Sequence, residues 1–161
     1  MDFSQDEYSG PIELLDSDLV AFFASRNSTP MARELALTWA EQISHTDKVV
    51  ISGFHSPLER EVLDALLKNN ASVIVGLGRS LYKRIPSHLQ QAFNEHRLLF
   101  LSFRNHVRHS VSNTQIRNWG VAQLAQTLIF APFDAGSSLS ALHYTFSEYN
   151  SQQKIIHILG S

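Results

Sequence analysis

The sequence of 161 residues contains no cysteine. This absence excludes disulfide bonds, thiolate metal ligands and a cysteine nucleophile, and it agrees with a reducing compartment. No apolar run approaches the roughly 20 residues of a membrane-spanning helix. The first ten residues, MDFSQDEYSG, lack the basic and apolar regions of a secretory signal. We therefore expect a cytoplasmic protein without membrane contact.

Basic residues are missing from the first 18 positions, which carry six acidic groups and neither Lys nor Arg. The rest of the chain has 13 basic against nine acidic groups and is mildly basic. Its densest basic stretch runs from Arg97 to His109, and such a stretch is more often a solvated surface than a phosphate site. We interpret residues 1–18 as a flexible acidic leader and residues 19–161 as one globular domain.

Segments with strand-like and helix-like patterns alternate along the whole chain, without a repeat or low-complexity tract. Strands are expected at 19–24, 49–52, 72–76, 98–102, 127–131 and 154–159. Helices are expected at 30–43, 56–68, 87–95, 112–124 and from 138 to about 150. Strands separated by helices pair in parallel, so we predict a doubly wound, mostly parallel Rossmann-like α/β sheet with helices on both faces.

The junction after the second expected strand has the strongest local signals. Three apolar β-formers end at Ser52-Gly53, Ser56 can cap the following helix, Pro57 suits its first position and Glu59 completes a capping box. Such strand-to-helix junctions favour anionic ligands, because helix dipoles and free backbone N–H groups converge there. The alternative is a tight turn with no ligand.

Four short motifs follow one another in order: Ser25-Arg26, Ser52-Gly53, Ile116-Arg117-Asn118, and the segment from Ala135 to Ala141. They resemble motifs of the DNA-processing protein A (DprA/Smf) family, within the wider SLOG group of nucleotide-sensing folds. That family has Gly-Ser-Arg, Arg-Asn-Arg and Ser-Gly-Ser-x-x-Thr-Ala at three of these places. The resemblance runs from about Leu19 to Leu159. It implies binding of single-stranded DNA and, as a partner, the RecA recombinase in DNA processing and recombination.

The sequence also departs from that family. Ala24 stands where the family has the Gly of Gly-Ser-Arg, and Trp119 replaces the second Arg of Arg-Asn-Arg. Phe54 to Glu59 replaces an Ala-Arg-Gly-Ile-Asp continuation. The helical and winged-helix modules of full-length members do not occur in these residues. The pattern is that of a short, single-domain branch.

We expect a phosphate site at the carboxyl ends of the strands, made by backbone amides and guanidinium groups. An aromatic side chain such as Phe54 would stack on a base there, and Tyr82, Phe103 and Phe133 also follow strand ends. The structural alternatives are a surface salt bridge for Arg26, a helix-to-sheet polar contact for Arg117 and helix capping for Ser137. The expected site comprises Ser25, Arg26, Ser52, Gly53, Phe54, His55, Arg79, Arg117, Asn118, Gly136 and Ser137.

Catalytic and metal chemistry have little support in the sequence. His55 and Glu59 lie one helical turn apart, as an acid–base pair would, but the capping box already accounts for Glu59. His106 and His109 are three residues apart without a third ligand at metal-site spacing. We expect no catalytic residue, no metal and no cofactor.

Two functions therefore remain for the sequence. The preferred one is a non-enzymatic binder of single-stranded DNA or a nucleotide. The alternative is a nucleotide-hydrolysing domain like the phosphoribohydrolases, whose Pro-Gly-Gly-x-Gly-Thr-x-x-Glu motif is reduced here to Pro132 and a single Gly. A homodimer formed through the strand from Lys154 to Leu159 is a further expectation, because a sheet edge can pair with a second copy.

Overall fold

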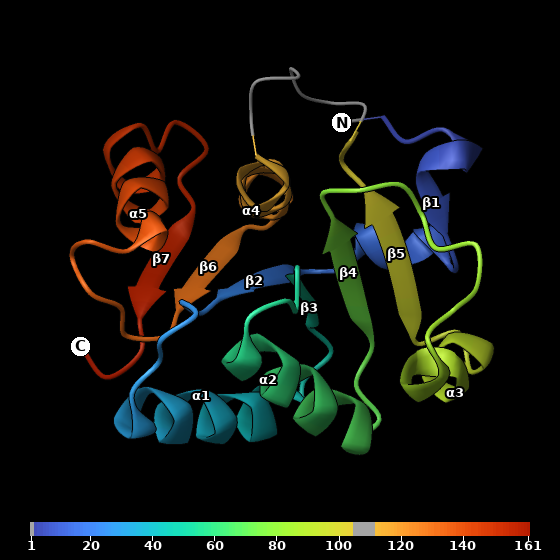
Figure 1. Ribbon diagram of the computed structural model, residues 1–161, viewed down its shortest axis with the longest axis horizontal. Coiled ribbons are helices and arrows are strands. Elements are labelled where there is room, and N and C mark those ends of the chain that lie inside the picture. The colour runs from blue at the N-terminus through green and yellow to red at the C-terminus, as the bar shows by residue number, and fades with distance from the viewer. Residues whose placement is uncertain (1, 105–111) are drawn as a thin grey trace.

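The computed structural model of the chain describes residues 2–104 and 112–161. Within these residues the strands form a single sheet in the order β1-β5-β4-β3-β2-β6-β7, with every pair from β5 to β7 parallel. The predicted doubly wound, mostly parallel fold is therefore confirmed (Figure 1). The parallel strands are β2 (Leu19–Phe23), β3 (Val49–Ser52), β4 (Val73–Leu77), β5 (Leu98–Ser102), β6 (Thr127–Phe130) and β7 (Ile155–Ile158).

Helices cover both faces of the sheet, as Figure 1 shows. On one face lie α1 (Pro30–Ile43), α2 (Pro57–Lys68) and α3 (Gln90–Asn94), and on the other lie α4 (Asn113–Leu124) and α5 (Ser138–Glu148). None of the helices in the described ranges is long and apolar enough to cross a membrane. Strand β7 forms one edge of the sheet, the position that the dimer expectation requires.

Side-chain caps start most of these helices where the sequence predicts them. Thr29 Oγ1 accepts a hydrogen bond from Ala32 N (3.1 Å), and capping boxes open α2 at Ser56 and α4 at Ser112. The helix expected over 87–95 is shorter than predicted, and Ser87 does not cap it. That residue lies inside a 3-10 turn, η3 (Ser87–Leu89), which has no side-chain cap and precedes α3.

The acidic leader is not the flexible tail that the sequence predicts. Within it, η1 (Gln5–Glu7) and η2 (Ile12–Asp16) flank β1 (Tyr8–Ser9). Strand β1 pairs antiparallel with β5, and Tyr8 lies opposite Leu101. Half-buried apolar side chains of the leader, including Phe3, pack against the core beneath α4. The charge composition of residues 1–18 does not predict this packing, because a few apolar residues are enough to anchor the segment.

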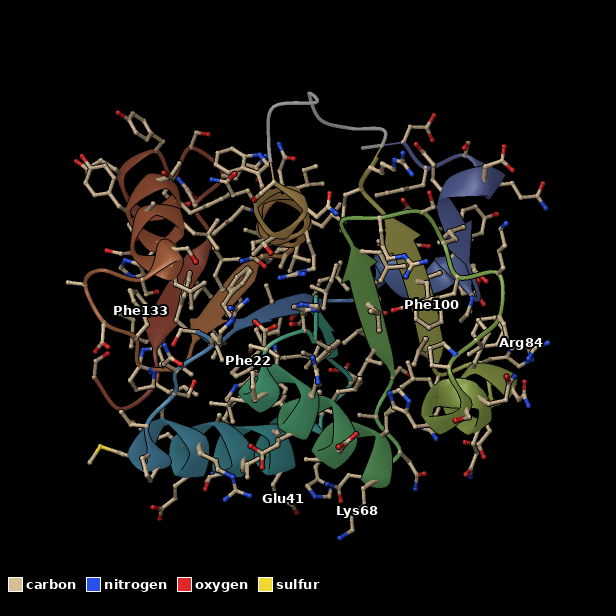
Figure 2. The ribbon with its side chains drawn as sticks, viewed as in Figure 1. Phe22, Glu41, Lys68, Arg84, Phe100 and Phe133 are labelled. Carbon is tan, nitrogen blue, oxygen red and sulfur yellow. The ribbon has the colours of Figure 1, made fainter. Side chains whose placement is uncertain are left out.

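The core is divided by the sheet into two layers, and buried aromatic side chains contribute to both. Phe22 stacks on Trp39 of α1 with ring centroids 5.1 Å apart, on the face that Figure 2 shows toward α1 and α2. On the opposite face, Phe23 stacks on Phe130 at 5.0 Å. Strands β2 to β5 are buried along their whole length, as expected for parallel strands covered on both faces.

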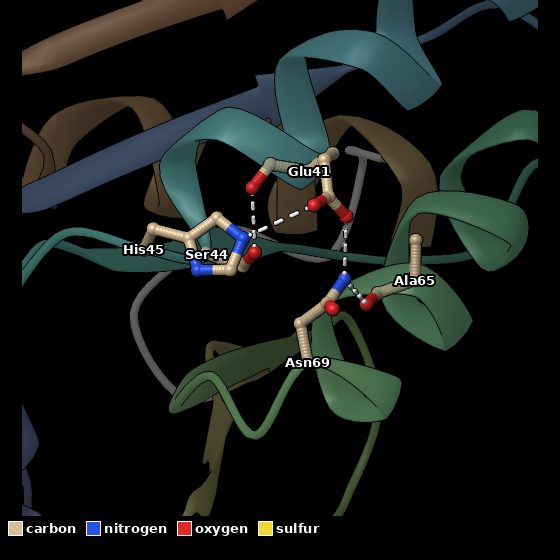
Figure 3. A network of polar contacts seen from close by, with 5 residues as sticks. All are labelled: Glu41, Ser44, His45, Ala65 and Asn69. Atoms are coloured by element: carbon tan, nitrogen blue, oxygen red, sulfur yellow. Dashed lines mark hydrogen bonds and ion pairs between the residues drawn. The ribbon is translucent and has the colours of Figure 1, made fainter.

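The C-terminal ends of α1 and α2 are joined by the carboxylate of Glu41 (Figure 3). Its Oε1 contacts His45 Nε2 at 3.1 Å, and its Oε2 accepts a hydrogen bond from Asn69 Nδ2 at 3.0 Å. These contacts, with the His45 hydrogen bond as the largest influence, lower the pKa of Glu41. The hydrogen bond from Asn69 thereby links the two helices at their C-terminal ends.

The strand order reverses between β2 and β6. The chain adds β3, β4 and β5 on one side of β2 and then crosses back to place β6 on the other side. Such a reversal opens a crevice at the carboxyl ends of the two central strands, which is the usual ligand site of doubly wound sheets. The loops after β2 and β6 diverge there, and the N-termini of α1 and α5 start from them.

Candidate functional site

A cavity of about 740 Å³ lies at this reversal and is named here the switch-point cavity. The loops after β2, β3 and β6 and the first turns of α4 form its walls. It brings together seven of the residues that the sequence predicts for the site, namely Ser25, Arg26, His55, Arg117, Asn118, Gly136 and Ser137.

The carboxylate of Glu59 fixes the back wall of the switch-point cavity. Its Oε2 accepts a hydrogen bond from Ala24 N (3.0 Å), and its Oε1 accepts from His55 N (2.9 Å) and Ser56 N (3.2 Å). Glu59 is only 3% exposed. One side chain thus caps α2 and also ties the end of β2 to the loop after β3. Its contact with His55 is to the backbone, so the two residues do not form a side-chain acid–base pair here.

Several backbone amides around the expected phosphate site donate hydrogen bonds inside the protein. Phe54 N donates to Ser52 Oγ (3.0 Å), and the next two amides donate to Glu59. Ser137 N donates to the carbonyl of Asp134 (2.9 Å), while its hydroxyl caps α5. Of the amides expected to hold a phosphate, that of Ser137 therefore already has a partner inside the fold. Guanidinium groups add anion-binding chemistry to the cavity.

Gly53 has a different role from the one the sequence indicates. We expected its missing side chain to admit a phosphate, but a Cβ at this position would overlap Cδ and Nε of Arg117. The space over Gly53 is therefore filled by the stem of Arg117. Because this stem lies flat on the backbone, its guanidinium is placed at the wall of the cavity rather than in solvent.

Arg117 is a half-buried cation with one buried donor that lacks a partner among the described residues. Its Nε is buried, and among residues 2–104 and 112–161 it has no hydrogen-bond partner. Burial lowers the pKa of Arg117, and the nearby charge of Glu59 opposes that effect. A buried, unsatisfied donor on a charged group is costly, so this position favours binding of an anion.

His55 reports the positive potential of the same cavity. Its pKa is lowered, first by burial and then by the charges of Arg117, Arg60 and Arg26, while Glu59 acts in the opposite direction. Three guanidinium groups therefore act on one imidazole at the mouth of the cavity. This concentration of charge attracts anions.

Four predicted residues lie elsewhere. Ser52 is fully buried and its hydroxyl serves the turn. Phe54 has a left-handed backbone (φ 47°) and is only 6% exposed, so its ring is part of the core and does not fit the stacking role we expected. Phe103, fully buried, is excluded from that role too. Gly53, Phe54 and Arg79 line a second cavity, which His55 and Arg117 also reach.

Sequence reasoning missed Arg60, Thr114 and Asp134, which also line the switch-point cavity. Arg60 had a usable signal, because it lies in the first turns of a capped helix whose N-terminus faces the strand ends. Its Nε donates to the carbonyl of His55 (3.0 Å). Asp134 had no such signal, because only the tertiary structure brings the loop after β6 to this point.

The side chains of the described residues contain no cluster of three metal-ligating groups. His106, Arg108 and His109 lie outside the described residues. The guanidinium groups that line the cavity can recognise an anion, with His55 as a titratable neighbour.

Comparison with known proteins identifies relatives of the whole fold. The family model described as DNA recombination-mediator protein A matches residues 7–154. Comparison with curated protein sequences finds no relative.

Solved structures of DNA processing protein A match over nearly the whole chain. The protein from Helicobacter pylori, studied for its single-stranded DNA binding mode, has a TM-score of 0.70 at 21% identity, over 94% of this chain and 69% of that one. The Streptococcus pneumoniae protein has a TM-score of 0.69 at 19% identity, over 96% and 54%. This chain thus spans about half to two thirds of their lengths. The Moco carrier protein of Chlamydomonas reinhardtii is more distant, with a TM-score of 0.59 at 10% identity, over 89% and 76%. At these identities the structures establish the shared fold.

Proposed function

The chain belongs to the DNA recombination-mediator protein A family, and from this membership and the geometry above we propose that it binds single-stranded DNA in the switch-point cavity. Binding involves no catalysis. Arg26, Arg60 and Arg117 contact the phosphates, and His55 lies between them. The observation that carries the proposal is the buried Nε of Arg117, which has no partner in the described part of the chain.

Each guanidinium has a distinct position in this proposal. Arg26 is exposed on the loop after β2 and can follow a flexible strand, whereas Arg117 is held over Gly53. Arg60 lines the cavity and is anchored there through the hydrogen bond from its Nε to His55 O. A planar guanidinium group can bind two phosphate oxygens at once. A DNA strand that crosses the mouth of the cavity can therefore contact all three arginines.

The salt dependence of binding tests the proposal directly. Fluorescence anisotropy with a labelled single-stranded oligonucleotide should give a log–log salt slope of about −2 for three phosphate contacts. Arg26→Ala should weaken binding several-fold and reduce the slope by about 0.7, the contribution of one contact. The matched control is Arg84→Ala, whose exposed side chain points outward at the far side of the sheet (Figure 2).

Absence of strand binding by the wild-type protein would refute the proposal. Equal slopes for wild type and Arg26→Ala would remove Arg26 from the site. Displacement of the strand by mononucleotide at equal phosphate concentration would favour a small-nucleotide site in its place.

The pH dependence of binding should follow His55. Its pKa lies below the ordinary histidine value, so at neutral pH the ring is uncharged and contributes little. As pH falls toward and below this lowered pKa, the ring gains a proton, adds positive charge beside the phosphates and tightens binding. His55→Gln should flatten this dependence, while the exposed His157→Gln on β7 should keep it. Anisotropy titrations at several pH values measure both. A pH response unchanged in His55→Gln would contradict this prediction.

A further inference from the structure

A second cavity of about 620 Å³ adjoins the first and lies over the ends of β4 and β5. Its inner lining is apolar and comes from four separate elements. The strands supply Val75, Leu77 and Phe100, α2 supplies Leu63 and η3 supplies Leu89. All five side chains are at most 6% exposed to solvent. The second cavity therefore has an apolar floor made of buried side chains.

The rim of the second cavity carries a planar pair of side chains. The guanidinium of Arg79 lies 4.6 Å from the centroid of the Tyr82 ring. The Tyr82 ring in turn meets Phe100, which Figure 2 labels on β5, edge to face at 5.4 Å. Arg79 Nε donates to Ser80 O (3.1 Å), which holds the guanidinium in place. Flat side chains of this kind stack on heteroaromatic rings.

Arg117 lies in the wall between the two cavities and lines both. Its stem crosses Gly53, and its Nε is the buried donor that lacks a partner among the described residues. An anionic group in the second cavity can therefore reach the same guanidinium as one in the first. His55 and Arg60 also face both spaces.

We propose that the second cavity binds one nucleotide unit, with its base on the apolar floor beside Tyr82 and Arg79 and its phosphate against Arg117. The chemistry of the lining favours a nucleotide over other classes of ligand. An aliphatic chain would leave the polar groups of Asp64, His88 and Asn113 at the mouth unused, and a bare sugar phosphate would leave the floor wet. A nucleotide is apolar on its ring faces, polar on its ring edge and anionic at one end.

Two sources can supply this unit. One is a free nucleoside monophosphate, which would bind in a site separate from the strand. The other is a nucleotide of the bound strand itself, and that source rests on the proposed function. In either case Arg117 couples the two cavities, since a phosphate in one competes for the guanidinium that faces the other.

Isothermal titration calorimetry with dAMP on the full chain tests the assignment. We expect dAMP to bind at least about tenfold more tightly than deoxyribose 5-phosphate, which has the phosphate without the base. Tyr82→Ala and Arg79→Ala should each weaken dAMP binding by about fivefold or more. Lys83→Ala, an exposed neighbour on the same loop, is the matched control and should leave it unchanged. Circular dichroism checks that each variant is folded.

The same variants in oligonucleotide titrations identify the source. If Tyr82→Ala weakens dAMP binding but leaves oligonucleotide binding within twofold, the cavity takes a free nucleotide. If both fall together, a nucleotide of the strand occupies it. The assignment is overturned if dAMP does not bind at millimolar concentration, or binds no better than deoxyribose 5-phosphate, or binds equally well to both variants. These results do not depend on whether the wild-type protein binds a strand, so the two proposals can fail separately.

Discussion

Replacing Glu59 with Ala should lower the free energy of unfolding by about 3 kcal/mol or more. The substitution removes a carboxylate that accepts three backbone hydrogen bonds and is almost completely buried. It leaves the amides of Ala24, His55 and Ser56 without their acceptor, and an unsatisfied buried donor costs about 1–3 kcal/mol. The loss of the capping box adds to this effect. Urea unfolding followed by circular dichroism measures the change.

The control for this result lies two residues away on the same helix. Glu61 forms an exposed ion pair with Arg33 at 2.7 Å, and such pairs contribute at most about 1 kcal/mol. Glu61→Ala should therefore change stability by less than that amount. If Glu59→Ala were no more destabilising than Glu61→Ala, the Glu59 carboxylate would not be what holds the loops after β2 and β3 together. A variant that stays folded should also bind oligonucleotide more weakly, because the loop after β3 carries His55.

Replacing Arg117 with Met should reduce affinity for single-stranded DNA by about tenfold or more while leaving the melting temperature equal or higher. Met keeps an apolar stem to cover Gly53 and removes the guanidinium. The substitution also removes the Nε donor that is buried without a partner within the described residues. Loss of the guanidinium should therefore not lower the stability of the fold. Anisotropy titration and a thermal scan on the same samples separate the two effects.

A second variant reaches the same guanidinium without changing Arg117. A Cβ on Gly53 would overlap Cδ and Nε of Arg117, and the long side chain must move aside to admit it. Gly53→Ala should therefore weaken binding in the same direction as Arg117→Met. If Arg117→Met destabilised the fold strongly and bound DNA normally, the guanidinium would be a structural group and the site would have to lie elsewhere.

The sequence by itself determined the order and type of most helices and strands. Apolar runs such as Val49 to Ser52, and caps such as Ser56 with Glu59, are local signals that depend on residues a few positions apart. The parallel arrangement followed from the alternation of strands and helices. The same reasoning failed for residues 1–18, because the pairing of Tyr8 and Ser9 with β5 joins segments about 90 residues apart along the chain.

The sequence predicted only part of the candidate site, because its residues also come from segments far apart along the chain. Arg26, His55, Arg117 and Gly136 were expected at the strand ends, and the reversal of strand order between β2 and β6 brings them to one cavity. Which groups are free to bind a ligand was decided only by the tertiary structure. Hydrogen bonds inside the fold use the amides after Gly53, and burial takes Phe54 into the core. Local patterns specify where a turn is placed, but only packing between distant segments specifies which donors remain unsatisfied.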